Sequence, residues 1–303
     1  MFPSERLKLT ILVDTENRKS TRKVNNTMLI EIWLKPTPGD ARFYERWEEV
    51  GERTENPREA EALVVGHDRV VTDDVLGARP KLRYIISPVT GHTHLCYSKA
   101  VFPDVKVLSL QGETEFLRGV MSVSEFVLRQ MLAMARPKHG TGRLLNGKTL
   151  GIVGFGRIGK QVSLLAHAFG MRVFHVDQES PLWAWHMLFK QSDFVSIHLP
   201  ETEETHGKVS RELIGMMKRD AFLINTARAS VVDQAALMEA LRKRAIAGAA
   251  LDLWEGEENF DGCNAHLSHH VAGSTVEDRI RTDEFMVEKL KAHLGPRRVH
   301  ERA

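Results

Sequence analysis

Apolar and polar positions alternate along this chain with two periods, one typical of buried strands and one of helices. Residues 122–136 carry apolar side chains at spacings of three and four until Pro137, which predicts a long helix. Further helices are expected at residues 41–50, 160–169 and 275–294. Strands that alternate with helices predict parallel sheets with helices on both faces. The apolar runs that predict the strands cover residues 9–13, 29–34, 62–65, 84–86, 149–153, 172–176, 194–198, 221–225 and 247–251.

The length of 303 residues is enough for two domains with separate cores. A content of 42% hydrophobic and 27% charged residues is that of a folded globular protein, and a net charge of +2 provides no broad field for nucleic acid or an anionic membrane. Cys96 and Cys263 predict neither a disulfide framework nor a thiolate metal site. The first ten residues include charged side chains where a signal peptide is apolar. We therefore expect a cytoplasmic protein without nucleic-acid or membrane partners.

A glycine-rich loop follows the strand predicted at residues 149–153. Gly154, Gly156 and Gly159 have the spacing G-x-G-x-x-G between a strand and a helix. In this context the first glycine permits a tight turn, the second allows a pyrophosphate to approach the backbone, and the third lets helix and strand pack closely. Asp177 ends the next strand 18 residues after Gly159, where a carboxylate can bind the adenosine ribose. Because Gln178 follows it rather than a cationic residue, the loop predicts NAD rather than NADP.

Three further segments follow predicted strands in the same half of the chain, at residues 225–233, 249–257 and 270–275. With the stretches at residues 122–126, 147–154 and 196–200, they make the sequence resemble the D-isomer-specific 2-hydroxyacid dehydrogenases, which include phosphoglycerate, glycerate and D-lactate dehydrogenases. The resemblance extends from about residue 81 to residue 275. It implies hydride transfer between NAD(H) and C2 of a small D-2-hydroxy acid or 2-keto acid.

The resemblance also assigns roles to individual residues. It implies that Arg228 binds the substrate carboxylate, that His270 is the acid/base, that Glu257 is its carboxylate partner, and that Asp252 contacts the nicotinamide side of the cofactor. The other cofactor-binding residues expected are Gly154, Gly156, Arg157, Ile158, Gly159, Asp177, His198, Pro200 and Ala227. The expected substrate-binding residues are Val89, Thr90, Gly91 and Arg228, and no metal is expected.

These residue types suit the chemistry. Oxidation of a secondary alcohol needs a hydride acceptor, a base for the hydroxyl proton and a cation for the neighbouring carboxylate. The planar guanidinium of Arg228 can bind a carboxylate through two hydrogen bonds. A carboxylate beside His270 is expected to raise the pKa of its imidazole, so that the ring can return the proton during reduction.

Several positions depart from the family pattern or have a second interpretation. His269 stands where the family has proline and the connection from Glu257 is short, so that His269 is the alternative acid/base. Residues 88–93 read Pro-Val-Thr-Gly-His-Thr where the family has Gly-x-Gly-x-Asp. We expect core packing for Trp183 and Trp185 rather than an adenine pocket. His92, His94 and Cys96 alternate like metal ligands but have no fourth ligand at zinc spacing.

We therefore expect an α/β protein with two doubly wound parallel-sheet lobes. Residues 1–118 with 276–303 form a flavodoxin-like substrate domain, and residues 119–275 form a Rossmann NAD-binding domain. The resemblance implies a homodimer built on the NAD-binding domain and the helix at residues 122–135. Two alternatives stay open: a non-catalytic NAD-sensing interaction protein on the same fold, as in the C-terminal-binding corepressors, and a formate dehydrogenase, in which the histidine is paired with glutamine rather than with a residue such as Glu257.

Overall fold

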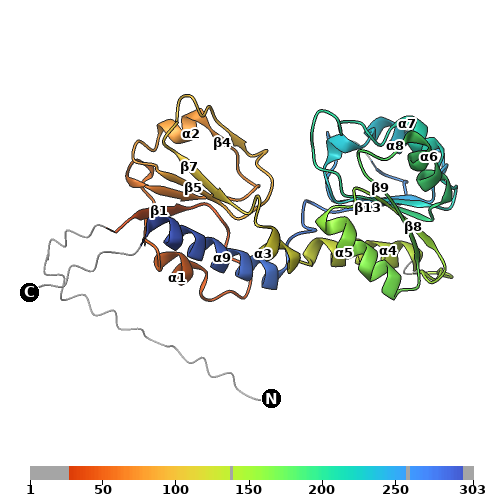
Figure 1. Cartoon of the computed structure of the whole chain (residues 1–303), viewed down its shortest axis with the longest axis horizontal. Helices are drawn as coiled ribbons and strands as arrows, with labels where there is room; N and C mark the ends of the chain where they lie inside the picture. The colour runs from red at the N-terminus through yellow and green to blue at the C-terminus, as the bar shows by residue number, and fades with distance from the viewer. Residues whose placement is uncertain (1–26, 137–138, 257–259, 296–303) are drawn as a thin grey trace, which may run out of the picture.

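The computed structural model describes residues 27–136, 139–256 and 260–295. Two parallel sheets form two lobes, joined by a short hinge, as Figure 1 shows. The first lobe contains the five-stranded sheet in the order β2-β1-β3-β5-β7, and the second contains the six-stranded sheet in the order β13-β12-β11-β10-β8-β9. Every strand pair is parallel, so the carboxyl ends of the strands lie along one edge of each sheet.

The first lobe is built from the N-terminal part of the chain and the last helix. Helices α1 and α9 lie on one face of its sheet and α2 on the other (Figure 1). A two-stranded sheet, β4 with β6, lies beside α2. Its elements are β1 (Leu29–Ile32), α1 (Phe43–Glu48), β2 (Glu52–Arg53), β3 (Ala62–Val64), β4 (Val71–Thr72), α2 (Asp73–Gly77), β5 (Tyr84–Ser87), β6 (Leu95–Cys96), β7 (Lys106–Ser109), α3 (Thr114–Arg118) and α9 (Val276–Leu294).

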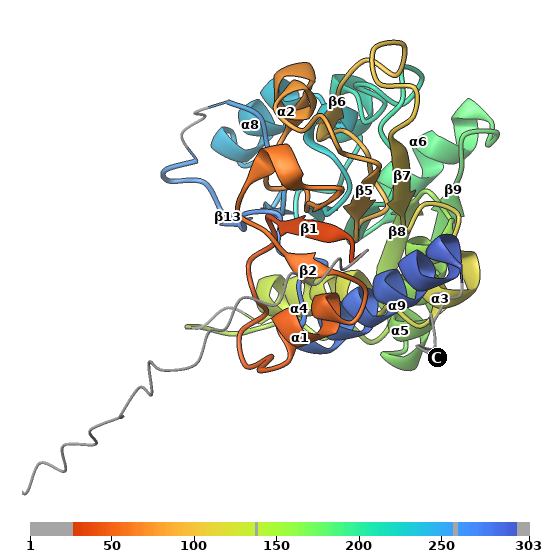
Figure 2. The same ribbon diagram turned by 90° about the vertical axis from the view of Figure 1, so that its left-hand side faces the viewer.

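In the second lobe, successive residues of a strand point to opposite faces of the sheet. Leu150 and Ile152 pack against α4 and α5 on one face, whereas Val153 packs against α6, α7 and α8 on the other. Figure 2 shows the lobe behind the first, with α4 and α5 below the sheet. Its elements are α4 (Ser122–Ala135), β8 (Thr149–Val153), α5 (Arg157–Ala168), β9 (Arg172–Val176), α6 (Leu182–Gln191), β10 (Phe194–Ile197), α7 (Arg211–Gly215), β11 (Phe222–Asn225), α8 (Gln234–Arg242), β12 (Gly248–Leu251) and β13 (Ala265–Leu267).

Charged side chains from both sides bind the hinge that joins α3 to α4. The guanidinium Nη1 of Arg157 donates to the carbonyl oxygens of Leu117 and Val120, each at 3.2 Å. The carboxylate of Asp278, at the start of α9, accepts from the backbone N–H of Ser122 at 3.1 Å. A carboxylate at the first turn of a helix satisfies free N–H groups and interacts well with the helix dipole. The hinge is therefore bound by α5 and by α9.

Most elements expected from the hydrophobic pattern are present with small shifts at their ends. The helix after the glycine loop begins at Arg157 rather than at residue 160. Strands β2, β4, β6, β7 and β13 were not expected; β13 is a short edge strand of only three residues, Ala265–Leu267. The strand expected at residues 9–13 lies outside the described residues. Within the described part of the chain, no helix is both long and apolar enough to cross a membrane.

The expectation of core packing is wrong for one of two tryptophans. Trp185 on α6 is 3% exposed, with the ammonium of Lys208 5.3 Å from its ring centroid. Trp183 on the same helix is 68% exposed. Positions two residues apart on a helix point in nearly opposite directions, so one indole faces the core and the other faces solvent.

Candidate active site

The glycine loop between β8 and α5 combines tight packing with one open position. A Cβ atom at Gly154, whose φ is +95°, would lie 2.7 Å from the carbonyl oxygen of His198. A Cβ at Gly159 would lie 2.3 Å from the carbonyl oxygen of Gly154, whereas nothing lies within 4 Å of a Cβ at Gly156. Two glycines are thus required by the close approach of backbone. Gly156 instead leaves free space at the amino end of α5, where a pyrophosphate could lie.

Asp177 follows β9 directly and lies beside this loop. One of its carboxylate oxygens accepts from the backbone N–H of Phe155 at 2.6 Å, and its own N–H donates to the hydroxyl of Ser180 at 3.0 Å. The residue is exposed. The contact places this carboxylate next to the glycine loop, and its contact with the ribose of the cofactor stays a prediction.

His198 and Pro200 lie on the other side of the loop, after β10. The backbone N–H of His198 donates to the carbonyl of Val153 at 2.7 Å, and its Nε2 lies 2.9 Å from the hydroxyl of Ser196. Burial lowers the pKa of the His198 imidazole to about 3. His198 is therefore neutral at ordinary pH and is placed to shape the loop rather than to carry charge.

Arg228 follows β11 and points towards the first lobe. A Cβ added to Gly91 would lie 2.6 Å from its Nη2, so the guanidinium reaches the loop that follows β5. Its Nη1 donates to the carbonyl of Ala227 at 2.7 Å, and its Nε lies 3.9 Å from the carboxylate of Glu201. The side chain is 29% exposed. The guanidinium thus faces the space between the two lobes with part of its hydrogen-bonding surface accessible.

Asp252, one strand further along the sheet, organises the segment that carries His270. Its carboxylate accepts from the hydroxyl of Ser268 at 2.6 Å and from the backbone N–H groups of Val271 at 3.0 Å and Ala272 at 2.9 Å. The carbonyl oxygen of Asp252 accepts from the N–H of His270 at 2.8 Å. Asp252 is only 1% exposed. The hydrogen bonds of its carboxylate are therefore with this loop, and a direct contact with the nicotinamide stays a prediction.

His270 has a left-handed backbone conformation, with φ +53°. This conformation is unfavourable for a residue with a side chain and persists where surrounding bonds impose it, as the Asp252 contacts do here. Its neighbour His269 is exposed, and the ring of His269 lies 5.2 Å from that of Trp254. Of the two histidines, His270 is the one directed towards Arg228 and the first lobe.

The described surroundings of His270 lower its pKa, whereas the sequence led us to expect a pKa raised by a carboxylate neighbour. Burial, followed by the nearby His67 and Arg228, lowers the pKa of the His270 imidazole to about 4, against a smaller opposing effect of Asp252. The carboxylate on which that expectation depended, Glu257, lies outside the described residues.

One residue of the site was not expected from the sequence. The ring centroid of His67 lies 4.1 Å from that of His270, with the planes tilted by 43°. His67 follows β3, the central strand of the first sheet, so its position at the carboxyl end of a parallel strand was the signal that could have identified it.

The loop after β5 supplies the expected substrate-side positions Val89, Thr90 and Gly91. Its histidines bond to serines of the same lobe: His92 Nε2 lies 2.8 Å from the Ser109 hydroxyl, and His94 Nε2 lies 2.9 Å from the Ser87 hydroxyl. Within the described residues, no group of histidine, cysteine and acidic side chains has a metal-binding arrangement.

Comparison with known proteins identifies the chain. Residues 114–272 match the model of the D-isomer specific 2-hydroxyacid dehydrogenase, NAD binding domain. The chain belongs to this family. A hydroxypyruvate reductase of Thermotoga maritima is 33% identical over 267 residues, covering 78% of this chain and 86% of that protein. A glyoxylate reductase of Korarchaeum cryptofilum is 33% identical over 274 residues, covering 78% of this chain and 81% of the relative.

Solved structures agree with this assignment. A protein from Thermus thermophilus has a TM-score of 0.73 at 28% identity, covering 88% of this chain and 97% of the other. The D-lactate dehydrogenase of Aquifex aeolicus, complexed with NAD and lactic acid, has the same fold, with a TM-score of 0.70 at 23% identity over 88% and 95% of the two chains. The chain is thus an NAD-dependent oxidoreductase of the D-2-hydroxyacid dehydrogenase family. The comparisons do not support the NAD-sensor or formate dehydrogenase alternatives.

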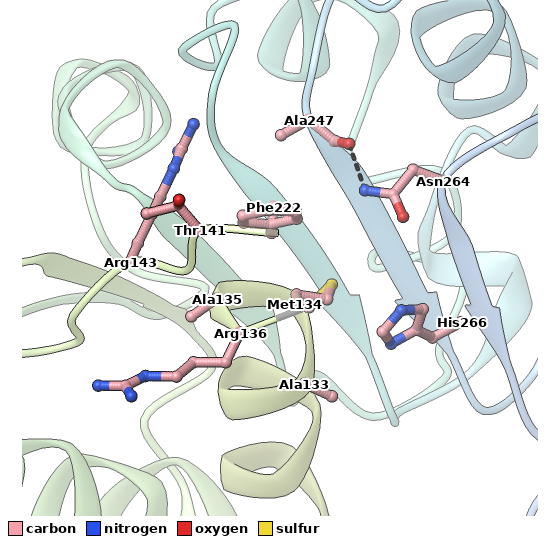
Figure 3. Close-up of a pocket in the computed structure, with 10 residues that line it drawn as sticks. All are labelled: Ala133, Met134, Ala135, Arg136, Thr141, Arg143, Phe222, Ala247, Asn264 and His266. Atoms are coloured by element: carbon pink, nitrogen blue, oxygen red, sulfur yellow. Dashed lines mark hydrogen bonds between the residues drawn. The ribbon is translucent and has the colours of Figure 1, made fainter. Parts of the chain in front are cut away.

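A separate hollow of about 610 Å³ lies at the opposite edge of this dehydrogenase's second sheet. Figure 3 shows it between the end of α4 and the amino ends of the strands, with the Asn264 side chain donating to the Ala247 carbonyl at 2.7 Å. Phe222 and Met134 form apolar parts of the wall. Because the candidate catalytic side chains follow the carboxyl ends of the strands, this hollow is distinct from the active site.

Proposed function

We propose that this protein reduces a small 2-keto acid with NADH, and that glyoxylate or hydroxypyruvate is the substrate to test first. The observation that carries the proposal is the convergence of Arg228 and His270. They follow two different parts of the second sheet, and each approaches a residue of the first lobe: Arg228 approaches Gly91, and His270 contacts His67. The names of the two relatives support the choice of substrates.

Arg228 is proposed to bind the substrate carboxylate. The accessible part of its guanidinium can donate two parallel hydrogen bonds to a carboxylate, which fixes the orientation of the neighbouring carbonyl. The backbone of residues 89–91 closes the other side of this position. The glycine loop and Asp177 are proposed to bind NAD(H), which when bound supplies the hydride for C2.

His270 is proposed to donate a proton to the carbonyl oxygen as negative charge develops there. In the free protein its lowered pKa, about 4, keeps the ring neutral near pH 7. A bound substrate carboxylate favours the imidazolium form because an opposite charge close to the ring raises its pKa. Proton uptake should therefore accompany substrate binding. Asp252 is proposed to hold the loop of His270 in place rather than to exchange protons.

A panel of 2-keto acids tests the proposal, with NADH oxidation followed by absorbance. We expect turnover of glyoxylate or hydroxypyruvate, loss of that turnover in His270→Asn, and retained NADH binding in the variant. The absence of turnover with every 2-keto acid, despite tight NADH binding, would contradict the proposal.

We further propose that the two lobes are the substrate domain and the NAD-binding domain, with boundaries near residues 118 and 275, and that the protein is a cytoplasmic homodimer built on α4. The free thiols of Cys96 and Cys263 support a reducing compartment. The hollow beside the end of α4 supports a surface that receives side chains of a second copy. Light scattering on the purified protein tests the dimer, since a mass of one chain would contradict it.

A further inference from the structure

A second histidine faces the proposed proton donor across the space between the lobes. The His67 and His270 rings are 4.1 Å apart between centroids. Of the aromatic ring contacts among the described residues, this is the one that joins the two lobes. His67 is part of the surface of the first lobe and is exposed, so its ring has no role in the core of that lobe.

The backbone just before His67 is buried, and the His67 side chain extends from it. Gly66 is buried, and a Cβ there would lie 2.9 Å from the Leu34 side chain and 3.1 Å from the Asp68 carboxylate. The turn that follows β3 thus packs against side chains of its own lobe. On the opposite side, Asp252 holds the loop of His270 through four hydrogen bonds. The contact therefore joins an exposed side chain of the first lobe to a histidine whose loop is held by hydrogen bonds.

Two imidazoles at this distance cannot both carry a proton without strong repulsion, because like charges a few ångströms apart disfavour each other's charged form. We propose that His67 is a positioning residue that packs on the ring of His270 when the lobes meet and competes with it for one proton. Binding of the substrate anion then directs that proton to His270. This inference rests on the proposed function, because it gives His67 a part in the same proton transfer.

The other charges near His270 act in the same direction or are committed elsewhere. Arg228, after β11, also disfavours a proton on His270. Asp252, after β12, favours it, but both of its carboxylate oxygens accept hydrogen bonds from the loop. His67 is thus the uncharged group of the first lobe that faces His270 and can itself take up the proton.

His67 has neighbours of both positive and negative charge. Asp68, its neighbour in sequence, favours the imidazolium form, as Asp252 does, whereas Arg228 and Arg279 disfavour it. Arg279, on the first turn of α9, also donates to the Lys35 carbonyl at 3.0 Å. Partial loss of solvent around this exposed ring is the largest effect and lowers the pKa of His67 as well. Both rings are therefore neutral in the free protein near pH 7, and an incoming carboxylate decides which of them is protonated.

The proton balance of the proposed step is simple. His270 takes one proton from solvent as the substrate anion binds beside Arg228. The hydride from NADH forms the new C–H bond at C2, and the N–H bond of the imidazolium breaks as its proton passes to the carbonyl oxygen. His270 returns to the neutral form, and His67 gains and loses nothing in the net reaction.

Two substitutions separate the effect of the ring from the effect of the proton. His67→Phe keeps an aromatic ring against His270 but cannot accept a proton, and His67→Ala removes both. His293→Phe is the matched control, because His293 is also a histidine of the first lobe and its ring packs against Tyr84, 5.9 Å away, rather than against His270.

The first readout is the titration of His270 by NMR in the complete protein, with its signal assigned by comparison with His270→Asn. We expect the midpoint to rise by roughly 1 pH unit in His67→Ala. The substitution removes the ring that buries His270 and also the positive charge of a protonated His67. A smaller rise is expected in His67→Phe and none in His293→Phe. An unchanged midpoint in both His67 variants overturns the proposal, whatever the activity.

The second readout is the pH profile of kcat/KM for reduction of hydroxypyruvate, which reports groups of the free enzyme. The alkaline limb should move to higher pH in the His67 variants by the shift measured in the titration. A shape-only role of His67 would change KM and leave this limb in place, which contradicts the proposal. If the titration shifts but no 2-keto acid is reduced by the parent enzyme, the proposed function fails while the competition between the two rings stands.

Discussion

The two lobes contribute to the active site in different ways. In the second lobe each candidate group is positioned by backbone contacts: the glycine loop has no room for a Cβ at Gly154 or Gly159, and Asp252 binds the His270 loop through buried hydrogen bonds. In the first lobe the corresponding group, His67, is an exposed side chain at the end of a strand. The candidate groups of the second lobe are thus held by a frame of backbone contacts, whereas His67 of the first lobe is an exposed side chain.

The largest effect should follow loss of the proposed proton donor. His270→Asn is expected to lower kcat by roughly a hundredfold or more, the usual scale for a general acid, with NADH affinity little changed. Steady-state kinetics and calorimetry are the measurements. His269→Ala serves as the control and should be far milder, because that ring packs on Trp254 instead. If His269→Ala lowered kcat more than His270→Asn, the proton donor would be His269, and our assignment of His270 would be wrong.

The second-largest effect is expected at Arg228, the proposed carboxylate-binding residue of the second lobe. Arg228→Lys retains a positive charge but loses the planar pair of donors, so kcat/KM for the 2-keto acid should fall on the order of tenfold to a hundredfold. NADH affinity should stay the same. An Arg228→Lys enzyme as active as the parent with every accepted substrate would show that no carboxylate is bound there.

A substitution in the first lobe tests whether the lobes meet at this point. In Gly91→Ala the new methyl group would lie 2.6 Å from Nη2 of Arg228, so the guanidinium must move. We expect KM for the 2-keto acid to rise about tenfold, since small displacements of an orienting group are costly. NADH binding is the internal control. If KM is unchanged, the contact between the loop and Arg228 does not persist in the substrate complex.

The smallest effect is expected at the cofactor. Asp177 should make NADH bind more tightly than NADPH, because a carboxylate at this position can bind a ribose hydroxyl and repels a phosphate. Asp177→Ala should weaken NADH binding by about fivefold, as for loss of one exposed hydrogen bond, and should improve binding of NADPH. Calorimetry with both cofactors measures this. Equal affinities in the parent protein would remove the assignment of Asp177.

The same contrast explains what could be predicted from the sequence. The spacing of Gly154, Gly156, Gly159 and Asp177 follows from local requirements of a strand, a turn and a helix, so it predicted the strand, glycine loop and helix that the structure contains. Short edge strands such as β13 were missed because three residues carry too little periodicity.

Contacts between distant segments could not be predicted in this way. The packing of His67 on His270 depends on how the lobes meet, 203 positions apart in the sequence, and no local pattern encodes it. For the same reason the sequence predicted the pKa of His270 from one acidic neighbour, Glu257, whereas among the described residues burial is the dominant effect and lowers that pKa. The exposure of Trp183 was missed for a similar reason, since composition alone cannot tell which side of a helix packs against the core.

Analysis of the product tests the account most directly. The enzyme is mixed with NADH and hydroxypyruvate, and the glycerate formed is counted against the NADH consumed and separated into its two enantiomers. If Arg228 and the first lobe hold the carboxylate and His270 holds the carbonyl oxygen, the hydride reaches only one face of C2, so one molecule of D-glycerate should appear for each NADH oxidised. A racemic product, or NADH binding without any product from hydroxypyruvate or glyoxylate, would contradict it.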